Sequence, residues 1–179
     1  MRFTSTALFL AVSAIAPAHA CDMVPPPQVT NDFKEKIPGW LVWKFTPQAG
    51  FGGHMLTGHF NRRTFPSAAQ ERAYLEKEIG RAAATLFNAR PSRAALDGPS
   101  SPVPQENQRF KTQARAFALT LDFNGHAVTA PGYMRINPNR KDIALIVAFV
   151  DPAHRAAANT IARNTMEHPG FDCTPGDSP

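Results

Sequence analysis

Three histidines, His54, His59 and His126, come closest to the residue types and spacing of a metal or acid–base site. Imidazole nitrogens bind transition metals, and imidazole titrates near neutral pH. His54 and His59 point to opposite faces of an unbroken strand, because side chains along a strand alternate with a period of two. Only a β-bulge at Gly58 would turn both toward one side. The spacing therefore favours three separate surface or strand-end histidines. A metal site built on His54, His59 and His126 is the alternative.

The other nucleophiles of the chain do not fall into a catalytic motif. No serine after residue 20 lies in a Gly-x-Ser-x-Gly pattern or has a histidine close by in sequence. The chain also lacks a His-Glu-x-x-His motif, a phosphate-binding loop and a dinucleotide-binding fingerprint. These absences favour a protein that is not an enzyme, and we expect no cofactor.

Two cysteines, Cys21 and Cys173, could form a covalent bond between residue 21 and the C-terminal end of the chain. In an oxidising compartment two cysteines are most simply a pair, and a zinc site needs more ligands at closer spacing. Cys21 also resembles the acylated cysteine of bacterial lipoproteins. The recognition sequence of that family usually carries leucine three residues before the cysteine, where this chain has Ala18. The sequence therefore favours a Cys21–Cys173 disulfide over a lipid anchor on Cys21.

Residues 1–20 have the three parts of a secretory signal peptide. Arg2 supplies the positive charge, residues 7–16 are an apolar run broken only by Ser13, and residues 18–20 fit a cleavage site. The apolar run is shorter than the about 20 residues that a permanent transmembrane helix needs, and no later stretch is longer. We expect cleavage after Ala20 and a mature protein that is periplasmic or secreted.

The length and charge of the mature chain limit its class. Cleavage leaves 159 of the 179 residues, which suits one domain with one core. These residues carry 18 basic and 14 acidic side chains, a formal net charge of +4. A charge so small and scattered argues against nucleic acid, but it suits another protein or an anionic component of the cell envelope as partner.

The first half of the mature chain reads as two strands followed by a helix. Residues 21–37 form a Pro-rich lead-in, and the alternation of residues 40–46 then predicts a strand. A glycine-rich turn leads to a second strand over residues 54–65. Ser67 and Gln70 form a capping box, which predicts the start of a helix. Its buried stripe comprises Leu75, Ile79, Ala82 and Leu86.

The second half reads as a long loop, three strands and a helix. Residues 88–108 are rich in Pro and Ser and have no period, so we expect a functional or disordered loop. Asn124-Gly125 predicts a type I′ hairpin that pairs Phe123 with His126. In the second strand of this hairpin, Pro131-Gly132 favours a sheet edge or a bulge.

The last strand and helix follow from residue 143 onward. Residues 143–150 are apolar at every position, which predicts the central strand. Asp151 and Pro152 are a favoured N-cap and first helical residue. We expect this helix to bury Ala157, Ile161 and Thr165 and to end at Pro169-Gly170.

The resulting order, β-β-α-loop-β-β-β-α, predicts an α+β fold. It comprises a mainly antiparallel sheet of about five strands, with both helices packed on one face. We place the domain at residues 38–172 and a C-terminal tail at 173–179.

One surface is expected to remain open for a partner, because both helices would cover the same face of the sheet. Trp40, Phe51, Arg62 and Arg63 lie on the first hairpin, and exposed aromatics beside arginines are typical of contact surfaces. The sequence thus favours an exported, non-catalytic binding module, such as an inhibitor, an immunity-type protein or an accessory subunit of an envelope assembly. A small metal-dependent envelope hydrolase is the alternative.

Overall fold

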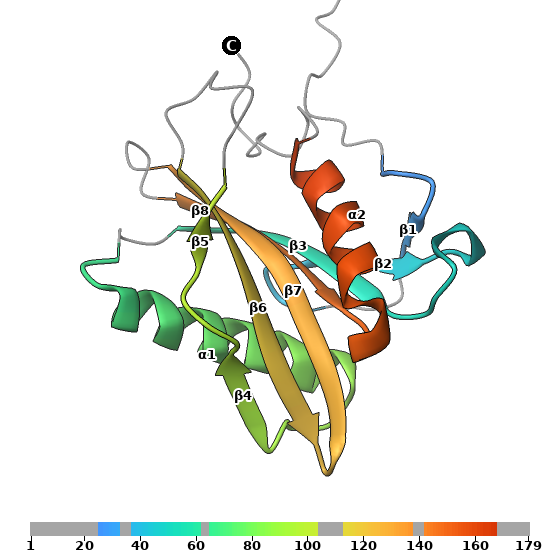
Figure 1. The fold of residues 1–179 in the computed structure, drawn as a ribbon, viewed down its shortest axis with the longest axis horizontal. Helices are drawn as coiled ribbons and strands as arrows, with labels where there is room; N and C mark the ends of the chain where they lie inside the picture. Colours follow the sequence, from blue (N-terminus) through green and yellow to red (C-terminus); the bar gives the residue numbers. More distant parts are fainter. Residues whose placement is uncertain (1–24, 33–36, 62–64, 104–112, 138–141, 168–179) are drawn as a thin grey trace, which may run out of the picture.

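The computed structural model describes residues 25–32, 37–61, 65–103, 113–137 and 142–167. In these residues one antiparallel sheet has eight strands, and two α helices flank it (Figure 1). The sheet order is β1-β2-β3-β8-β7-β6-β4, and β5 also pairs with β6. The strands are β1 Val29–Asn31, β2 Leu41–Phe45, β3 His54–Asn61, β4 Arg93–Leu96, β5 Ser101–Pro102, β6 Gln113–Phe123, β7 His126–Asn137 and β8 Asp142–Phe149. The α helices are α1 Ala68–Leu86 and α2 Arg155–Glu167, and two short 3-10 helices are η1 Pro47–Ala49 and η2 Pro152–His154.

The α+β class and the antiparallel sheet are confirmed, whereas the number of strands is corrected. The five predicted strands correspond to β2, β3, β6, β7 and β8. The three additional strands, β1, β4 and β5, are two to four residues long and lie in the Pro-rich lead-in and in the Pro/Ser-rich loop. Strands this short show no period in sequence, and they form because β2 and β6 offer them hydrogen-bonding edges.

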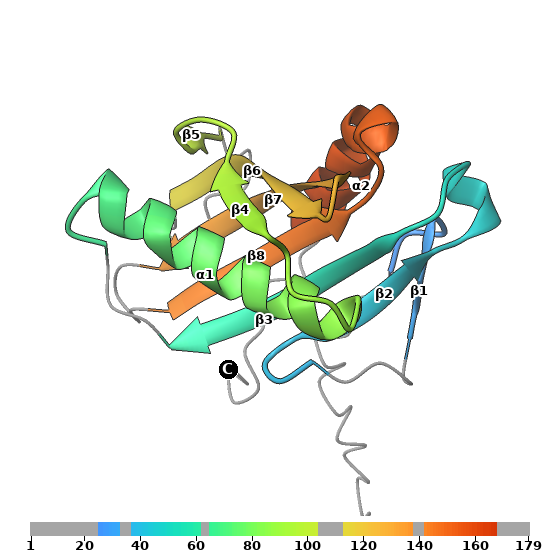
Figure 2. The ribbon, with the colours of Figure 1, turned by 90° about the horizontal axis from the view of Figure 1, so that it is seen from below.

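The two helices lie on opposite faces of the sheet, which corrects the prediction of a single covered face (Figures 1 and 2). Leu75 and Ile79 of α1 pack in one cluster with Leu145 of β8. Ile161 of α2 packs in the other cluster, with Ile146 of the same strand. The reason lies in β8 itself, which is apolar and buried on both faces and therefore needs cover on both.

The central position of β8 is confirmed, since it lies between β3 and β7. β7 is also an interior strand, which corrects the expectation of an edge or bulge at Pro131-Gly132. The pairing of β7 with β8 reaches Gly132↔Val147 and continues in the same register at Thr129↔Val150, so no residue is inserted. Pro131, which has no N–H to donate, falls between these two pairs.

The start of α1 is confirmed at Ser67, whose hydroxyl accepts from the Gln70 N–H at 3.3 Å. The 124–125 hairpin is confirmed as well. Asn124 and Gly125 have φ of 56° and 91°, as a type I′ turn requires, and Phe123 pairs with His126.

The N-cap of the last helix is confirmed at Asp151, whose carboxylate accepts from the Ala153 N–H at 2.9 Å. η2 forms the first turn, and α2 continues from it. Ile161 and Thr165 are buried as expected, but Ala157 is exposed and Ala158 takes its place against the sheet. The expected stop at residues 169–170 lies outside the described residues. Neither described helix is long and apolar enough to cross a membrane.

Candidate functional site

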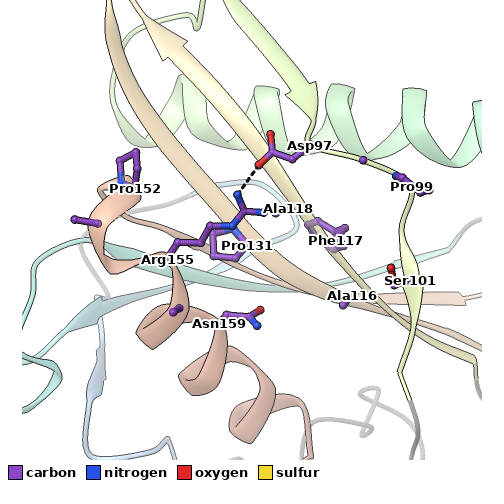
Figure 3. Close-up of a pocket in the computed structure, with 13 residues that line it drawn as sticks. Asp97, Pro99, Ser101, Ala116, Phe117, Ala118, Pro131, Pro152, Arg155 and Asn159 are labelled. Atoms are coloured by element: carbon purple, nitrogen blue, oxygen red, sulfur yellow. Dashed lines mark ion pairs between the residues drawn. The ribbon is translucent and has the colours of Figure 1, made fainter.

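A hollow of about 520 Å³ opens on the α2 side of the sheet, and we name it the α2 hollow (Figure 3). Its floor is formed by small side chains of β6 and β7, among them Ala116, Ala118 and Pro131. The first turns of η2 and α2 form one wall. The opposite wall is the segment 97–100 between β4 and β5, which we name the strap.

The strap leaves room for the hollow because it contains two residues more than the strand beside it. Leu96 pairs with Leu119 and Ser101 with Ala116. Four strap residues therefore face two residues of β6, and the strap bows outward like a large bulge. Gly98 lies at the bow, where no heavy atom is within 4 Å of the position of a Cβ. Residues 93–103 of the Pro/Ser-rich loop thus form an edge of the sheet beside β6.

Asp97 fixes the strap on the side of the hollow. Its N–H donates to the Ala118 carbonyl at 2.8 Å, and its Oδ1 accepts from the Thr120 hydroxyl at 2.6 Å. Its Oδ2 lies 2.9 Å from a guanidinium nitrogen of Arg155 at the start of α2. Figure 3 shows this ion pair spanning the hollow above Pro131. The pair joins the two walls, although their residues are far apart in sequence.

Ser100 fixes the strap on the α1 side. Its hydroxyl makes a short hydrogen bond to the Glu71 carboxylate of α1. Arg115 of β6 donates to the Ser100 hydroxyl at 2.7 Å, to the Ser100 carbonyl at 2.8 Å and to Glu71 at 3.2 Å. Ser100 and Glu71 are buried, so each needs these partners. The strap is thereby attached to both helices and to β6.

Asn159 adds a polar group to the hollow from the second turn of α2. It is hydrogen-bonded to the buried phenol of Tyr133 on β7. Burial raises the pKa of Tyr133 above its ordinary value of 10.0, whereas the charge of Arg163 and the bond to Asn159 oppose the rise. Tyr133 is therefore a neutral support beneath α2 at physiological pH.

The structure keeps the three candidate histidines apart. His54 and His59 lie on opposite faces of β3, which pairs with β8 without a bulge at Gly58. His54 contacts Phe87 at the end of α1, and His126 is exposed at the 124–125 hairpin. In the described part of the chain no group of three or more His, Cys, Asp or Glu side chains is arranged to hold a metal ion.

Gly58 has a packing role in β3 and forms no bulge in its pairing with β8. A Cβ at this position would lie 2.8 Å from the Gly39 carbonyl oxygen and 2.8 Å from the Phe60 ring. Phe60 packs edge to face against Trp40, with ring centroids 5.0 Å apart. Gly58 thus permits the close packing of this aromatic pair.

The predicted contact surface on the first hairpin is only partly exposed. Trp40 is buried against the α1 side, at 7% exposure, which corrects the expectation of an exposed indole. Phe51 is half-buried, stacked on His154 and close to Phe45. Arg62 and Arg63 lie outside the described residues, as do Cys21 and Cys173. A partner contact at Phe51, Arg62 and Arg63 and the disulfide both stay predictions.

Sequence reasoning missed Asp97, Arg155 and the hollow between them. The one feature of the sequence that pointed to this region was the absence of a hydrophobic period in residues 88–108, which predicted a functional or a disordered loop. Nothing in the sequence relates Asp97 to Arg155, because their proximity follows from the pairing of β4 with β6 and the packing of α2. Neither protein-family models nor curated proteins gave a match to the chain.

Proposed function

We propose that this chain is an exported, non-catalytic binding protein that recognises its partner through the α2 hollow. The observation that carries the proposal is the combination of an apolar floor with a few fixed polar groups around it. Ligand sites have volumes of about 300–1,000 Å³, a range that includes the 520 Å³ found here. The strap, attached to both helices, holds the site in shape before a partner arrives.

The groups around the hollow support binding and not catalysis. Asp97 is engaged by Thr120 and Arg155, and no histidine or cysteine lines the hollow within the described residues. Ser101 supplies the one hydroxyl side chain among the described lining residues, and the one carboxylate there, Asp97, is held by Thr120 and Arg155 instead of by Ser101. A site of this kind holds a ligand through contact and hydrogen bonds alone.

The location outside the cytoplasm rests on residues 1–20, which have the charge, apolar run and cleavage site of a signal peptide. The disulfide between Cys21 and Cys173 belongs to the same proposal, because it would form in that compartment. A net charge of +4 after cleavage suits a protein partner or an anionic component of the envelope.

Two variants of neighbouring residues on α2 test the proposed site. Ala156 lines the hollow and Ala157 does not, and both are exposed in the first turn of the helix. We expect Ala156→Phe to fill the hollow and to lower the capture of the partner from envelope extract at least about tenfold. We expect Ala157→Phe to retain capture, with both variants keeping the parent melting temperature.

Ala118→Phe fills the same hollow from the floor and serves as an independent second variant. Equal capture by the parent, Ala156→Phe and Ala118→Phe would place recognition elsewhere on the molecule. A loss with Ala157→Phe as large as that with Ala156→Phe would point to the outer face of α2 instead.

A further inference from the structure

The geometry points to a ligand class for the α2 hollow: a carboxylate carried on a compact apolar body. This inference rests on the proposed function, since it names what the same hollow would hold. The carboxylate belongs either to a small organic acid or to the C-terminal residue of a peptide. The two sources share the chemistry that the hollow would recognise.

Three polar side chains of the hollow, Arg155, Asn159 and Ser101, can donate hydrogen bonds. Arg155 carries five N–H groups in a planar fork, and its contact with Asp97 is a single pair at 2.9 Å. The remaining N–H groups can bind a carboxylate with two parallel hydrogen bonds. Asn159 and Ser101 add an amide and a hydroxyl to the same hollow.

Asp97 is the charged acceptor of the hollow, and its two oxygens are already used. Oδ1 accepts from Thr120 and Oδ2 pairs with Arg155. Arg155 already neutralises this carboxylate, so a cationic ligand at Asp97 would compete with Arg155 for the same charge. An anionic ligand only has to share Arg155, whose side chain is 47% exposed and so reachable from solvent.

The floor favours a ligand with an apolar group over a fully polar one. Ala116, Ala118 and Pro131 present methyl and ring carbons without a polar side-chain atom. A flat or small apolar group buries its surface on such a floor, whereas a hydrated inorganic anion gains nothing from it. The walls of Pro99 and Pro152 are equally apolar and fix the width of the hollow.

Asp97 also limits the affinity for such an anion, because it competes for Arg155 and repels a second carboxylate. Removing its charge should therefore strengthen binding, whereas removing the charge of Arg155 should weaken it. A purely structural ion pair predicts no such difference, since both changes break the same contact. Opposite changes in ligand affinity on removing the two charges would therefore identify the inferred ligand.

Titrations of the mature protein, residues 21–179, with two matched pairs of probes test the inference. One pair is benzoate and benzamide, and the other is N-acetyl-tetraalanine as free acid and as C-terminal amide. We expect each acid that binds to shift the amide signals of Ala116, Ala118 and Asn159 and the methyl signals of the two alanines, with a dissociation constant of about 1 mM or lower. The matched amide should bind at least about tenfold more weakly.

Two variants complete the test with benzoate. Arg155→Gln should lower the affinity at least about tenfold, whereas Asp97→Asn should raise it about two- to fivefold, the range that an exposed ion pair is worth. Tighter binding of the peptide acid than of benzoate identifies a chain end as the source, and the reverse identifies a free acid.

Acids that bind no better than their amides would overturn the inference, as would weaker benzoate binding by Asp97→Asn at an unchanged melting temperature. If the acids fail while Ala156→Phe still abolishes partner capture, the binding function stands and only the ligand class is wrong.

Discussion

Gly132 lies where the sheet has no space for a side chain. A Cβ at this position would overlap the carbonyl oxygen of Ile146 on β8 and lie 2.8 Å from the Phe117 ring. The residue therefore allows β7 to lie between β6 and β8 while Phe117 packs across it. Neither the β8 backbone at Ile146 nor the buried Phe117 ring can move aside without a substantial cost in free energy.

Gly132→Ala is accordingly expected to destabilise the protein by about 1–3 kcal/mol or more, measured by urea unfolding. Gly52→Ala is the matched control, because no heavy atom lies within 4 Å of its Cβ position and its φ is not in the left-handed region. Equal stability of the two variants would show that the packing of β7 is misplaced.

Tyr133 gives the protein a defined response to alkaline pH. Its pKa is raised in the folded state by burial, so the folded state holds the phenolic proton more tightly than the unfolded chain does. The resulting stability is complete below about pH 10 and is lost as the pH rises through the folded-state pKa.

We expect the melting temperature of the parent to fall more steeply above about pH 10 than that of Tyr133→Phe, which has no phenol to titrate. The comparison removes the contribution of every other group, because parent and variant differ only at residue 133. Parallel pH curves for parent and variant would indicate that Tyr133 is not held neutral by its surroundings.

At the scale of elements, the strap depends on the cluster of Glu71, Ser100 and Arg115. Arg115→Met leaves the buried Glu71 carboxylate without its cation and the Ser100 carbonyl without its donor. We expect a loss of about 1–3 kcal/mol of unfolding free energy and faster hydrogen exchange in the strap.

The double variant Arg115→Met with Glu71→Leu should recover part of this loss, because it removes the unpaired charge together with its partner. A double variant as unstable as the sum of the two single variants would show that the cluster is not coupled.

The elements also show what a sequence can predict here. Ser67 capping α1 and the Asn124-Gly125 turn were predictable, because both are decided by neighbouring residues. β4 and β5 were not, since Arg93–Leu96 and Ser101–Pro102 become strands only by pairing with β6. The placement of one helix on each face of the sheet could have been predicted from β8, because a strand that is apolar on both faces has to be covered on both.

The candidate site was less predictable than the fold. Asp97 and Arg155 each sit in unremarkable local sequence, and their ion pair arises from the two-residue excess of the strap and the packing of α2. Trp40 was expected to be exposed, because the alternation of side chains shows which face of a strand a residue is on but not what covers that face. In the structure, Trp40 is buried by α1 and by the Phe60 ring.

At the scale of the whole molecule, the predicted Cys21–Cys173 disulfide would connect the two ends of the mature chain. A closed loop of this length is worth about 4–5 kcal/mol in the chain-entropy model, and real bonds often deliver less. We expect a mature mass that begins at Cys21 and no reactive thiol in the exported protein. Cys173→Ser should lower the melting temperature.

Two titratable thiols in the exported protein would contradict the disulfide, and a diacylglycerol mass on Cys21 would identify a lipid anchor in its place. An envelope fraction that retains Met1 would contradict cleavage of residues 1–20. These outcomes do not test the α2 hollow, whose described lining contains neither a cysteine nor a residue of the segment 1–20.

The central claim, recognition through the α2 hollow, is tested most directly by an amide chemical-shift map of the isotopically labelled mature protein with its captured partner. We expect the largest shifts at residues 97–101, 116–118 and 153–159, on the strap, the floor and the start of α2. Shifts that gather instead on the first hairpin, from Trp40 to Arg63, with the strap unchanged, would contradict it.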